Sequence, residues 1–276
     1  MTLPDEELRR RLASQLWTSH NVRLSEEVTT MPGQPDFIET DLRLKAILRV
    51  LRFLYRDNFA ALSAVDLGSL EGGFALALAQ LGMNVTGIEA RWKNFEKLQL
   101  LKEHFGLRNL SFEMDDVKNF TRERFGIFDV TLALGILYHL DSPSAWLRQV
   151  AAATRSLLIV DSHYAPTEDE GLARLDTRLK LGPLVAMKDV DEVYEGRWFF
   201  EYDERAERED QLWASYSNRS SFWLTKESLL KALLRSGFDL VLEQHDYSAA
   251  SYKRLTITFP RTMILAIKSD RFSGKL

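Results

Sequence analysis

The sequence contains no cysteine among its 276 residues. That absence excludes a disulfide scaffold, a cysteine nucleophile and every metal site with a cysteine ligand. Glycine and proline are also few, with 14 and 7 residues, so a collagen-like or low-complexity chain is excluded. Hydrophobic residues make up 45% and charged residues 28%, which is the composition of a globular protein.

An excess of positive charge is missing as well. The chain has 36 Lys and Arg against 40 Asp and Glu, a net charge of −4. Proteins that bind nucleic acid carry a basic footprint, so the overall charge argues against a nucleic-acid partner, although a local basic patch is still open. No run approaches the eighteen or so apolar residues of a membrane span, and the acidic residues 1–7 do not resemble a signal peptide. We therefore expect a soluble cytoplasmic protein with no membrane partner, and its oligomeric state is left open.

Short apolar runs alternate with helical stretches from residue 62 onward. The expected strands are residues 64–67, 84–88, 110–114, 128–134 and 157–160. Continuous apolar strands separated by helices are typical of a parallel sheet that is covered on both faces. Two late strands, 238–243 and 262–268, complete a Rossmann-like α/β fold with a seven-stranded, mostly parallel sheet and one reversed strand.

The domain organisation is predicted from changes in composition and hydrophobic pattern along the chain. Residues 1–60 are expected to form an N-terminal helical arm or lid, with helices over 4–17 and from about residue 40. Residues 61–276 form the main domain. An insert at about 162–224 interrupts it, because charged and aromatic residues are concentrated there.

A glycine turn follows the first expected strand, where open α/β sheets bind their ligands. The run holds Asp66, Gly68, Ser69, Glu71 and Gly72. Its spacing is neither the G-x-G-x-x-G of dinucleotide-binding proteins nor a P-loop. A carboxylate just before the first glycine would repel a pyrophosphate and suits a ligand with an ammonium group.

Acidic residues also end the next two expected strands. Glu89, followed by Ala90, stands where an acidic side chain accepts hydrogen bonds from ribose hydroxyls. Asp115, Asp116 and Val117 follow the third strand, in place to meet an adenine amino group. Carboxylates at three consecutive strand ends describe a nucleoside with an amino-acid tail, which is S-adenosylmethionine (SAM).

The pattern of Asp66, Gly68 and Gly72 resembles the class I SAM-dependent methyltransferases, over about residues 60–160. The sequence departs from that family at 69–71, where many members have small or glycine residues. The turn is expected to stay intact, and Glu71 is expected to add a polar contact of its own.

Residues 135–143, Gly-Ile-Leu-Tyr-His-Leu-Asp-Ser-Pro, are similar to a segment of the subgroup around the tRNA wobble-uridine carboxymethyltransferases. Trp17 and His20 resemble the arm that closes over the cofactor in that subgroup, and residues 218–225 resemble its late segment. The resemblance implies cofactor contacts for Trp17, His20 and Gly135.

Much of that subgroup acts on small molecules, including C-methylation of prenyl diphosphates in natural-product pathways. The resemblance therefore implies methyl transfer to a small, largely apolar acceptor such as geranyl diphosphate. Two alternatives stay open, O-methylation of a hydroxylated or phenolic metabolite and modification of the tRNA wobble uridine.

Methyl transfer needs an aligned donor and acceptor, and often a base that removes one proton. Such a base is expected near the ends of the fourth and fifth strands, where the candidates are Tyr138, His139, His163 and Glu170. His163 is the first candidate, as base, phosphate donor or metal ligand, and a structural histidine is the alternative. His163, Glu168 and Glu170 are candidate ligands of a Mg²⁺ ion.

The aromatic residues of the insert are the expected acceptor pocket. They are Trp198, Phe199, Phe200, Tyr202 and Trp213. Aromatic rings hold an apolar chain and stabilise a carbocation, although they could equally form the core of a lid. Basic residues of the insert, among them Arg197, are candidates to meet a phosphate.

Overall fold

The computed structural model describes residues 2–168, 181–202, 208, 210–212, 214–246 and 260–272. The chain forms two compact units, Met1–Val117 and Lys118–Leu276. The arm predicted at residues 1–60 therefore shares its compact unit with the first three strands. None of the helices in the described ranges has both the length and the apolar character needed to cross a membrane.

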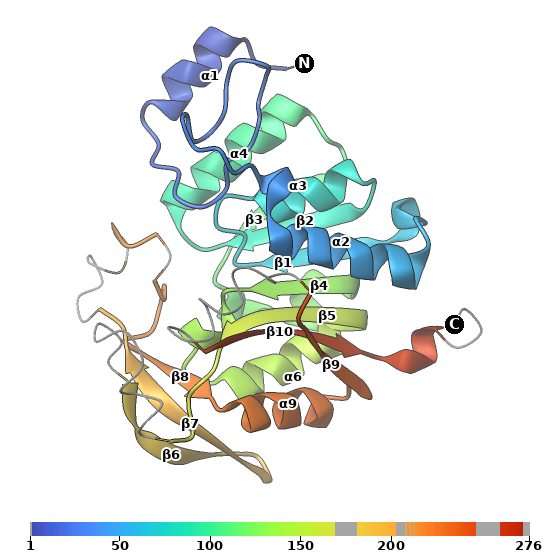
Figure 1. The fold of residues 1–276 in the computed structure, drawn as a ribbon, viewed down its shortest axis with the longest axis vertical. Helices are drawn as coiled ribbons and strands as arrows, with labels where there is room; N and C mark the ends of the chain where they lie inside the picture. The colour runs from blue at the N-terminus through green and yellow to red at the C-terminus, as the bar shows by residue number, and fades with distance from the viewer. Residues whose placement is uncertain are drawn as a thin grey trace. The chain divides into compact units, whose positions relative to one another are not determined.

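The first unit contains four α-helices and three strands among its described residues. The helices are α1 (Asp5–Leu12), α2 (Leu42–Tyr55), α3 (Gly73–Gln80) and α4 (Trp92–Phe105). The strands are β1 (Ser63–Leu67), β2 (Asn84–Glu89) and β3 (Leu110–Met114). β2 pairs in parallel with both β1 and β3, and the three lie side by side in Figure 1. Short 3₁₀ turns occupy Ile38–Thr40 and Phe59–Ala61.

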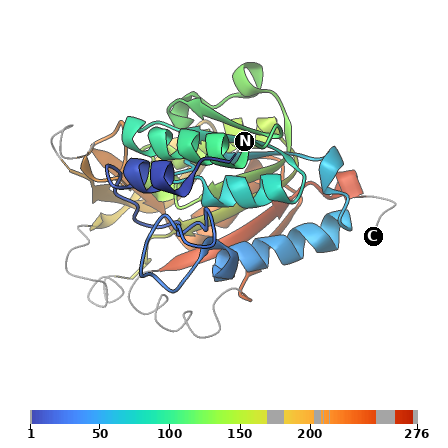
Figure 2. The same ribbon diagram turned by 90° about the horizontal axis from the view of Figure 1, so that it is seen from above.

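Local sequence explains where these helices begin and end. The Asp41 carboxylate accepts the backbone N–H groups of Arg43 and Leu44 and so caps α2. Gly72 precedes α3 in the left-handed conformation, and Gly106 ends α4 in the same conformation. Between α1 and α2 the chain is an irregular loop, the dark-blue segment of Figure 2. We call this segment, residues 13–41, the arm loop.

The second unit contains a parallel strand pair with an antiparallel continuation. Its sheet strands are β4 (Phe128–Leu134), β5 (Thr154–His163), β9 (Leu240–Gln244) and β10 (Arg261–Ile267). β4 and β5 run in parallel, whereas β10 is antiparallel to both β5 and β9. The helices are α5 (Arg122–Phe125), α6 (Pro143–Ala153) and α9 (Lys226–Arg235), with 3₁₀ turns at Val117–Asn119, Leu137–His139 and Ser269–Phe272.

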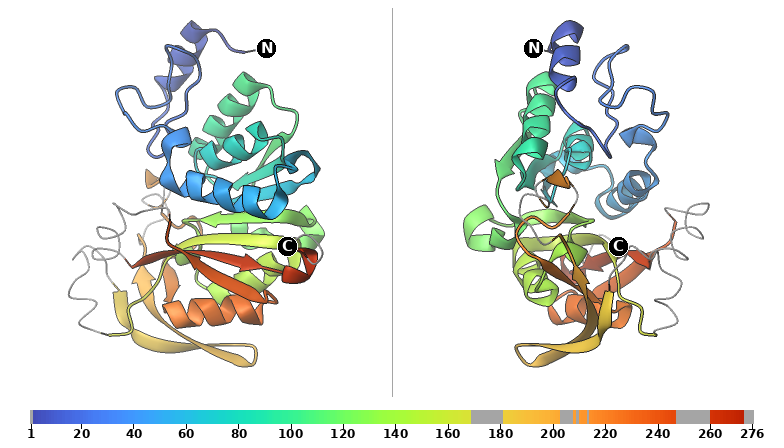
Figure 3. Two further views of the ribbon diagram at one scale, coloured as in Figure 1. Left: turned by 45° about the vertical axis from the view of Figure 1, so that its right-hand side comes forward. Right: turned by 90° about the vertical axis from the view of Figure 1, so that its left-hand side faces the viewer.

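A smaller sheet occupies the region predicted as an insert. Its strands are β6 (Leu181–Asp189), β7 (Glu192–Phe200) and β8 (Ser220–Leu224), and all neighbours are antiparallel. β6 and β7 form a long curved hairpin in both views of Figure 3. The sequence did not predict these strands, because their charged residues hide the alternation that an apolar strand would show.

The strand order of the large sheet across the described residues is β3-β2-β1-β4-β5-β10-β9. Only β10 is reversed, which confirms the predicted seven-stranded, mostly parallel α/β sheet with one reversed strand. Pro143 stands in the first turn of α6, and the Thr225 hydroxyl caps α9 by accepting the N–H of Ser228.

Candidate active site

The turn after β1 is tight and ordered by backbone contacts. Gly68 and Gly72 both have positive φ angles, 75° and 77°, which favour glycine. The N–H groups of Gly68 and Ser69 donate to the carbonyl of Ile88 on β2, at 3.0 and 2.9 Å. A Cβ atom at Gly72 would stand 2.6 Å from a methyl carbon of Leu98, so this position also lacks room for a side chain.

Asp66 lies at the carboxyl end of β1, with 3% of its surface exposed. Its Oδ2 atom is buried and has no hydrogen-bond partner in the described chain. Burial raises the pKa of Asp66 to about 7, and the neighbouring Glu89 carboxylate adds to that rise. A buried carboxylate oxygen with an unused lone pair fits a cationic group such as the ammonium of SAM.

Glu89 ends β2 and is also buried, at 5% exposed. Its Oε2 accepts the N–H of Leu70 and its Oε1 accepts the N–H of Arg91, both at 2.9 Å. Burial raises the pKa of Glu89 above its ordinary value, and these hydrogen bonds oppose the rise. The Asn94 side chain also hydrogen-bonds this carboxylate, so Glu89 is fixed in place by three donors. A carboxylate has about four acceptor positions, so it can still accept a hydroxyl.

Ala90 follows Glu89, and the residues predicted to meet adenine follow β3. The Asp115 N–H donates to the Glu89 carbonyl at 3.1 Å, and the Asp115 Oδ1 atom accepts the N–H of Asp116 at 2.8 Å. Val117 is buried. Because β1, β2 and β3 are parallel, Asp66, Glu89 and Asp115 share the carboxyl edge of the first unit's sheet.

Glu71 makes its polar contacts with the arm loop and with Lys97. It is wholly buried, and its Oε1 lies 2.8 Å from the Lys97 ammonium, which is equally buried. It also accepts the backbone N–H groups of Thr18, Ser19 and His20, at 2.7, 3.0 and 2.8 Å, and the Thr18 hydroxyl at 3.1 Å. All of these partners belong to the chain itself. Glu71 therefore joins the arm loop to the glycine turn.

His20 strengthens the same junction. Its Nδ1 atom accepts the N–H of Gly73 at 3.0 Å, at the start of α3. Burial lowers the pKa of His20 to about 4, so the imidazole is neutral and can act as that acceptor. The Lys97 ammonium lies 5.5 Å from the centre of the Trp17 ring. The structure thus brings the two predicted arm residues, Trp17 and His20, to the side of the glycine turn.

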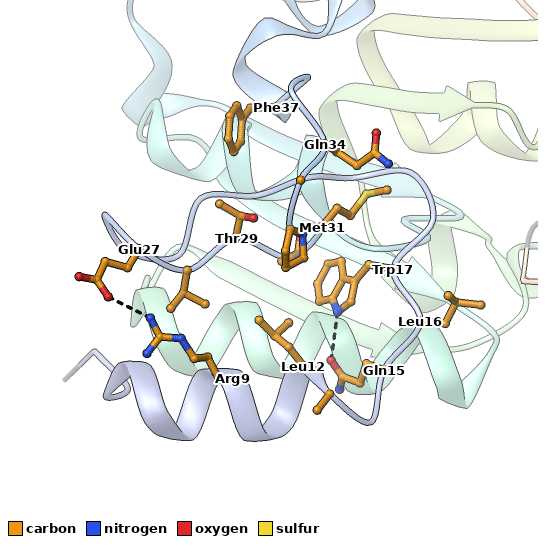
Figure 4. Close-up of a pocket in the computed structure, with 15 residues that line it drawn as sticks. Arg9, Leu12, Gln15, Leu16, Trp17, Glu27, Thr29, Met31, Gln34 and Phe37 are labelled. Carbon is orange, nitrogen blue, oxygen red and sulfur yellow. Dashed lines mark hydrogen bonds and ion pairs between the residues drawn. The ribbon is translucent and has the colours of Figure 1, made fainter.

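The arm loop and α1 enclose a pocket of about 780 Å³ (Figure 4). Trp17 lines it together with Leu12, Met31 and Phe37, and its Nε1 donates to Gln15 at 3.3 Å. Trp17 is the only residue of the predicted cofactor set in this lining. The pocket therefore belongs to the arm and not to the carboxyl edge of the sheet.

In the second unit, Gly135 follows β4 with a φ of 79°, and its N–H donates to the Asp161 carbonyl at 2.8 Å. The wholly buried Asp161 carboxylate receives a two-pronged ion pair from Arg261, with N–O distances of 2.7 and 2.8 Å. A Cβ atom at Gly135 would lie 3.5 Å from the Arg261 guanidinium and 3.6 Å from the Tyr138 hydroxyl. Polar groups of three separate segments therefore meet beside this turn.

His163 is the centre of an aromatic cluster in this unit. Its ring stacks on Trp223 at 5.1 Å and 9°, and the Tyr138 ring meets it edge-on at 4.6 Å. Its Nδ1 lies 3.2 Å from the Pro260 carbonyl and its Nε2 lies 3.5 Å from the Arg261 guanidinium. Burial lowers the pKa of His163 to about 3, and Arg261 adds to the fall. Both ring nitrogens face a partner, so His163 is poorly placed as a base.

His139 differs from His163 because a carboxylate, and not a guanidinium, lies beside its ring. Its Nδ1 lies 2.9 Å from the Oε1 of Glu201, whose side chain is 2% exposed. Glu201 also accepts the Ser221 hydroxyl at 2.7 Å and the Ser215 N–H at 3.4 Å. Burial raises the pKa of Glu201, but the hydrogen bonds from His139, Ser221 and Ser215 outweigh it and hold the pKa below its ordinary value. The pair is an ionised carboxylate beside an imidazole.

Of the residues predicted to form the acceptor pocket, four lie among the described residues. Two of them pack against other aromatic rings and two are exposed. Phe199 stacks on Trp223 at 5.2 Å, and Trp198 meets Phe222 edge-on at 5.1 Å. Phe200 and Tyr202 are 58% and 43% exposed. Trp223 is 3% exposed, and its indole N–H has no hydrogen-bond partner in the described chain.

Two of the predicted site residues, Glu170 and Trp213, lie outside the described residues. Glu168 is exposed. In the ranges that the structure describes, no group of three or more His, Asp or Glu side chains could hold a metal ion. The predicted Mg²⁺ ion therefore has no support here.

A family model described as a methyltransferase domain matches residues 38–243. The chain belongs to this family. The prediction of a SAM-dependent methyltransferase is thereby confirmed at the level of the enzyme class, whereas the narrower resemblance to the tRNA wobble-uridine subgroup stays a prediction. No protein of curated function matches the chain.

Solved methyltransferase structures share the fold. The chain is similar to the N-terminal domain of EvdMO1 in the presence of S-adenosylhomocysteine (SAH) and D-fucose, with 22% identity, a TM-score of 0.71, and 96% of this chain and 97% of that chain covered. It covers 47% of the full EvdMO1 chain. It is also similar to magnesium protoporphyrin IX methyltransferase from Synechocystis PCC 6803 with bound SAM, with 17% identity, a TM-score of 0.51 and 87% of each chain covered.

Sequence reasoning missed Glu201, Trp223, Asp161 and Arg261 as members of the second unit's cluster. Glu201 meets a histidine 62 positions away, and Arg261 meets an aspartate 100 positions away. No local pattern reports such pairs. One signal was present in the resemblance of residues 218–225, because Ser221 bonds to Glu201 and Trp223 stacks on His163.

Proposed function

We propose that this methyltransferase transfers the methyl group of SAM to an oxygen atom of a small, hydroxylated acceptor. On the cofactor side, Asp66 would hold the ammonium group and Glu89 the ribose hydroxyls. When bound, SAM supplies an electrophilic methyl group on a sulfonium. The fit rests on the buried Asp66 Oδ2, which has no partner within the described chain.

The observation that carries the acceptor class is the buried indole N–H of Trp223. A buried donor without an acceptor costs about 1–3 kcal/mol, so this position favours a ligand that brings an oxygen. The ring stacks with His163 and with Phe199, and Tyr138 meets it edge-on. An acceptor with both a hydroxyl and an apolar face suits these surroundings.

A prenyl diphosphate acceptor has weaker support. A diphosphate needs cations, and the predicted phosphate contact Arg197 is 1% exposed and donates to the carbonyls of Pro166 and Gly182, at 2.9 and 3.1 Å. Modification of tRNA also lacks support, because the net charge is −4. Methylation of a prenyl diphosphate and methylation of tRNA are therefore both checked in the experiment below.

The test is a product screen with methyl-labelled SAM. Separate reactions contain D-fucose, other deoxysugars, simple phenols, geranyl diphosphate with Mg²⁺, and total tRNA. D-fucose comes first because the EvdMO1 domain was crystallised in its presence. We expect label on an oxygen of a hydroxylated acceptor, unchanged by a chelator. Label on geranyl diphosphate or tRNA alone would overturn the proposal.

A pair of variants sharpens the test. Trp223→Phe keeps the stacked ring and removes the N–H, so the KM of the hydroxylated acceptor should rise about 2- to 12-fold, the worth of one neutral hydrogen bond. Trp198→Phe is the matched control, since Trp198 packs on Phe222 instead. Equal KM values for both variants would show that the indole N–H of Trp223 does not bind the acceptor.

A further inference from the structure

We infer that His139 is the general base that removes the proton of the acceptor hydroxyl, and that Glu201 is the positioning residue that holds its imidazole. The inference rests on the proposed function, because only an O–H acceptor has such a proton to lose. His139 stands at the end of the turn Leu137–His139 that follows β4. Glu201 follows β7, in the smaller sheet.

The hydrogen bond between them fixes the state of the ring. An ionised carboxylate only accepts, so the Nδ1 atom of His139 must carry the hydrogen and donate to Glu201 at 2.9 Å. The lone pair of the neutral ring then lies on Nε2. No hydrogen bond joins this nitrogen to any part of the chain that the structure describes.

A second layer of contacts holds the carboxylate. The Ser221 hydroxyl donates to Glu201, and the Asn218 amide donates to the Ser221 oxygen at 3.1 Å. The Ser215 hydroxyl in turn donates to the Asn218 carbonyl oxygen at 2.7 Å. The backbone joins the two halves of the pair, since the Phe222 N–H donates to the Leu140 carbonyl at 2.8 Å. Such support is what a group with one fixed orientation needs.

The contacts of His163 explain why the role of base is assigned to His139 and not to His163. Both Nδ1 and Nε2 of His163 face neighbours, a carbonyl and a guanidinium. The cationic Arg261 beside it opposes a second positive charge on the ring. Beside His139 the nearest charge is the Glu201 carboxylate, which stabilises the imidazolium that forms when a proton arrives.

The acceptor O–H bond breaks and its proton passes to Nε2 of His139, while an oxygen lone pair forms the new O–CH₃ bond. The C–S bond breaks, and its electron pair remains on the sulfur of SAH. The proton then leaves the His139 imidazolium to solvent, and Glu201 stays ionised throughout.

Three variants and one control test the base and its positioning residue by turnover. With a hydroxylated acceptor from the product screen, His139→Asn should lower kcat by about 10²–10⁴-fold, the usual share of a general base. With 4-nitrophenol, which ionises without help near neutral pH, the same variant should lose much less. Glu201→Gln should lower kcat, and Glu201→Asp should restore part of it. Glu192→Gln is the matched control on β7, because Glu192 pairs with Lys231 and Arg235 instead.

Nuclear magnetic resonance of ¹⁵N-labelled histidine in the SAH complex gives a readout that needs no acceptor. We expect the Nδ1–H tautomer for His139 at neutral pH and its loss in Glu201→Gln. An Nε2–H tautomer, or a fall in kcat below about threefold for His139→Asn with every hydroxylated acceptor, would overturn the inference while O-methylation stands. If only geranyl diphosphate or tRNA is methylated, the proposed function fails, and the inference fails with it.

Discussion

Two buried glutamates, one in each compact unit, have opposite relations to their neighbours. Glu71 accepts from three backbone N–H groups, one hydroxyl and the Lys97 ammonium. Glu201 accepts from one hydroxyl, one N–H and the His139 ring. The partners of the first carboxylate are backbone N–H groups, a hydroxyl and an ammonium, which act here only as donors. The second carboxylate is bonded to an imidazole, which has a second ring nitrogen.

The difference teaches how to separate structural from chemical roles among buried carboxylates. Burial and ion pairing are common to both residues, so neither property alone identifies an active site. What differs is the partner. We therefore expect Glu71 to matter for folding and arm docking, and Glu201 to matter for turnover.

The largest expected effect in the first unit is on stability. Glu71→Gln leaves the Lys97 ammonium buried without its counter-charge, and we expect a loss of about 3–5 kcal/mol in the free energy of unfolding. Denaturant titration measures it, and hydrogen exchange at residues 18–20 should rise. Glu103→Gln is the control, since its pair with Arg11 is exposed and should cost at most about 1 kcal/mol. Equal losses for the two variants would contradict a structural role special to Glu71.

A smaller effect is expected at the sheet edge. Glu89→Ala removes the acceptor proposed for the ribose hydroxyls, so SAH affinity should fall by about 1–3 kcal/mol in calorimetry. Glu113→Ala, on the exposed side of the neighbouring strand, serves as the control. Unchanged affinity in a folded Glu89→Ala protein would sink the ribose assignment.

The smallest effect is a pH dependence of cofactor binding. The pKa of Asp66 is about 7, so roughly a tenth of the carboxyl groups are ionised at pH 6 and roughly nine tenths at pH 8. An ammonium group binds the ionised form, so SAH affinity should rise about tenfold across that range. Asp66→Asn should bind more weakly and lose this dependence. A flat profile in the parent protein would disconnect Asp66 from the ammonium.

Much of the fold could be predicted from the sequence because its signals are local. The apolar runs mark β1 to β5, and the helix caps at Gly72 and Thr225 mark helix starts. The β6–β7 hairpin escaped because it is half exposed, and residues such as Lys188 and Glu195 interrupt any apolar pattern.

The residues of the candidate site also fall into those that the sequence could predict and those that it could not. Asp66 and Glu89 could be proposed as cofactor contacts from their position alone, because each lies at the carboxyl end of a predicted strand. The pairing of His139 with Glu201 depends on how β7 and β8 meet the turn after β4, which no spacing reports. The partners of Glu71 could not be predicted from the glycine motif, because they include the arm loop, more than fifty positions earlier.

One paired measurement tests the contrast between the two glutamates most directly. The free energy of unfolding and the kcat for a hydroxylated acceptor are measured for Glu71→Gln and Glu201→Gln beside the parent protein. We predict a crossover, in which Glu71→Gln loses the larger share of stability and Glu201→Gln loses the larger share of kcat under conditions where both proteins are folded. Losses of stability and kcat in the same proportion for both variants would contradict the account.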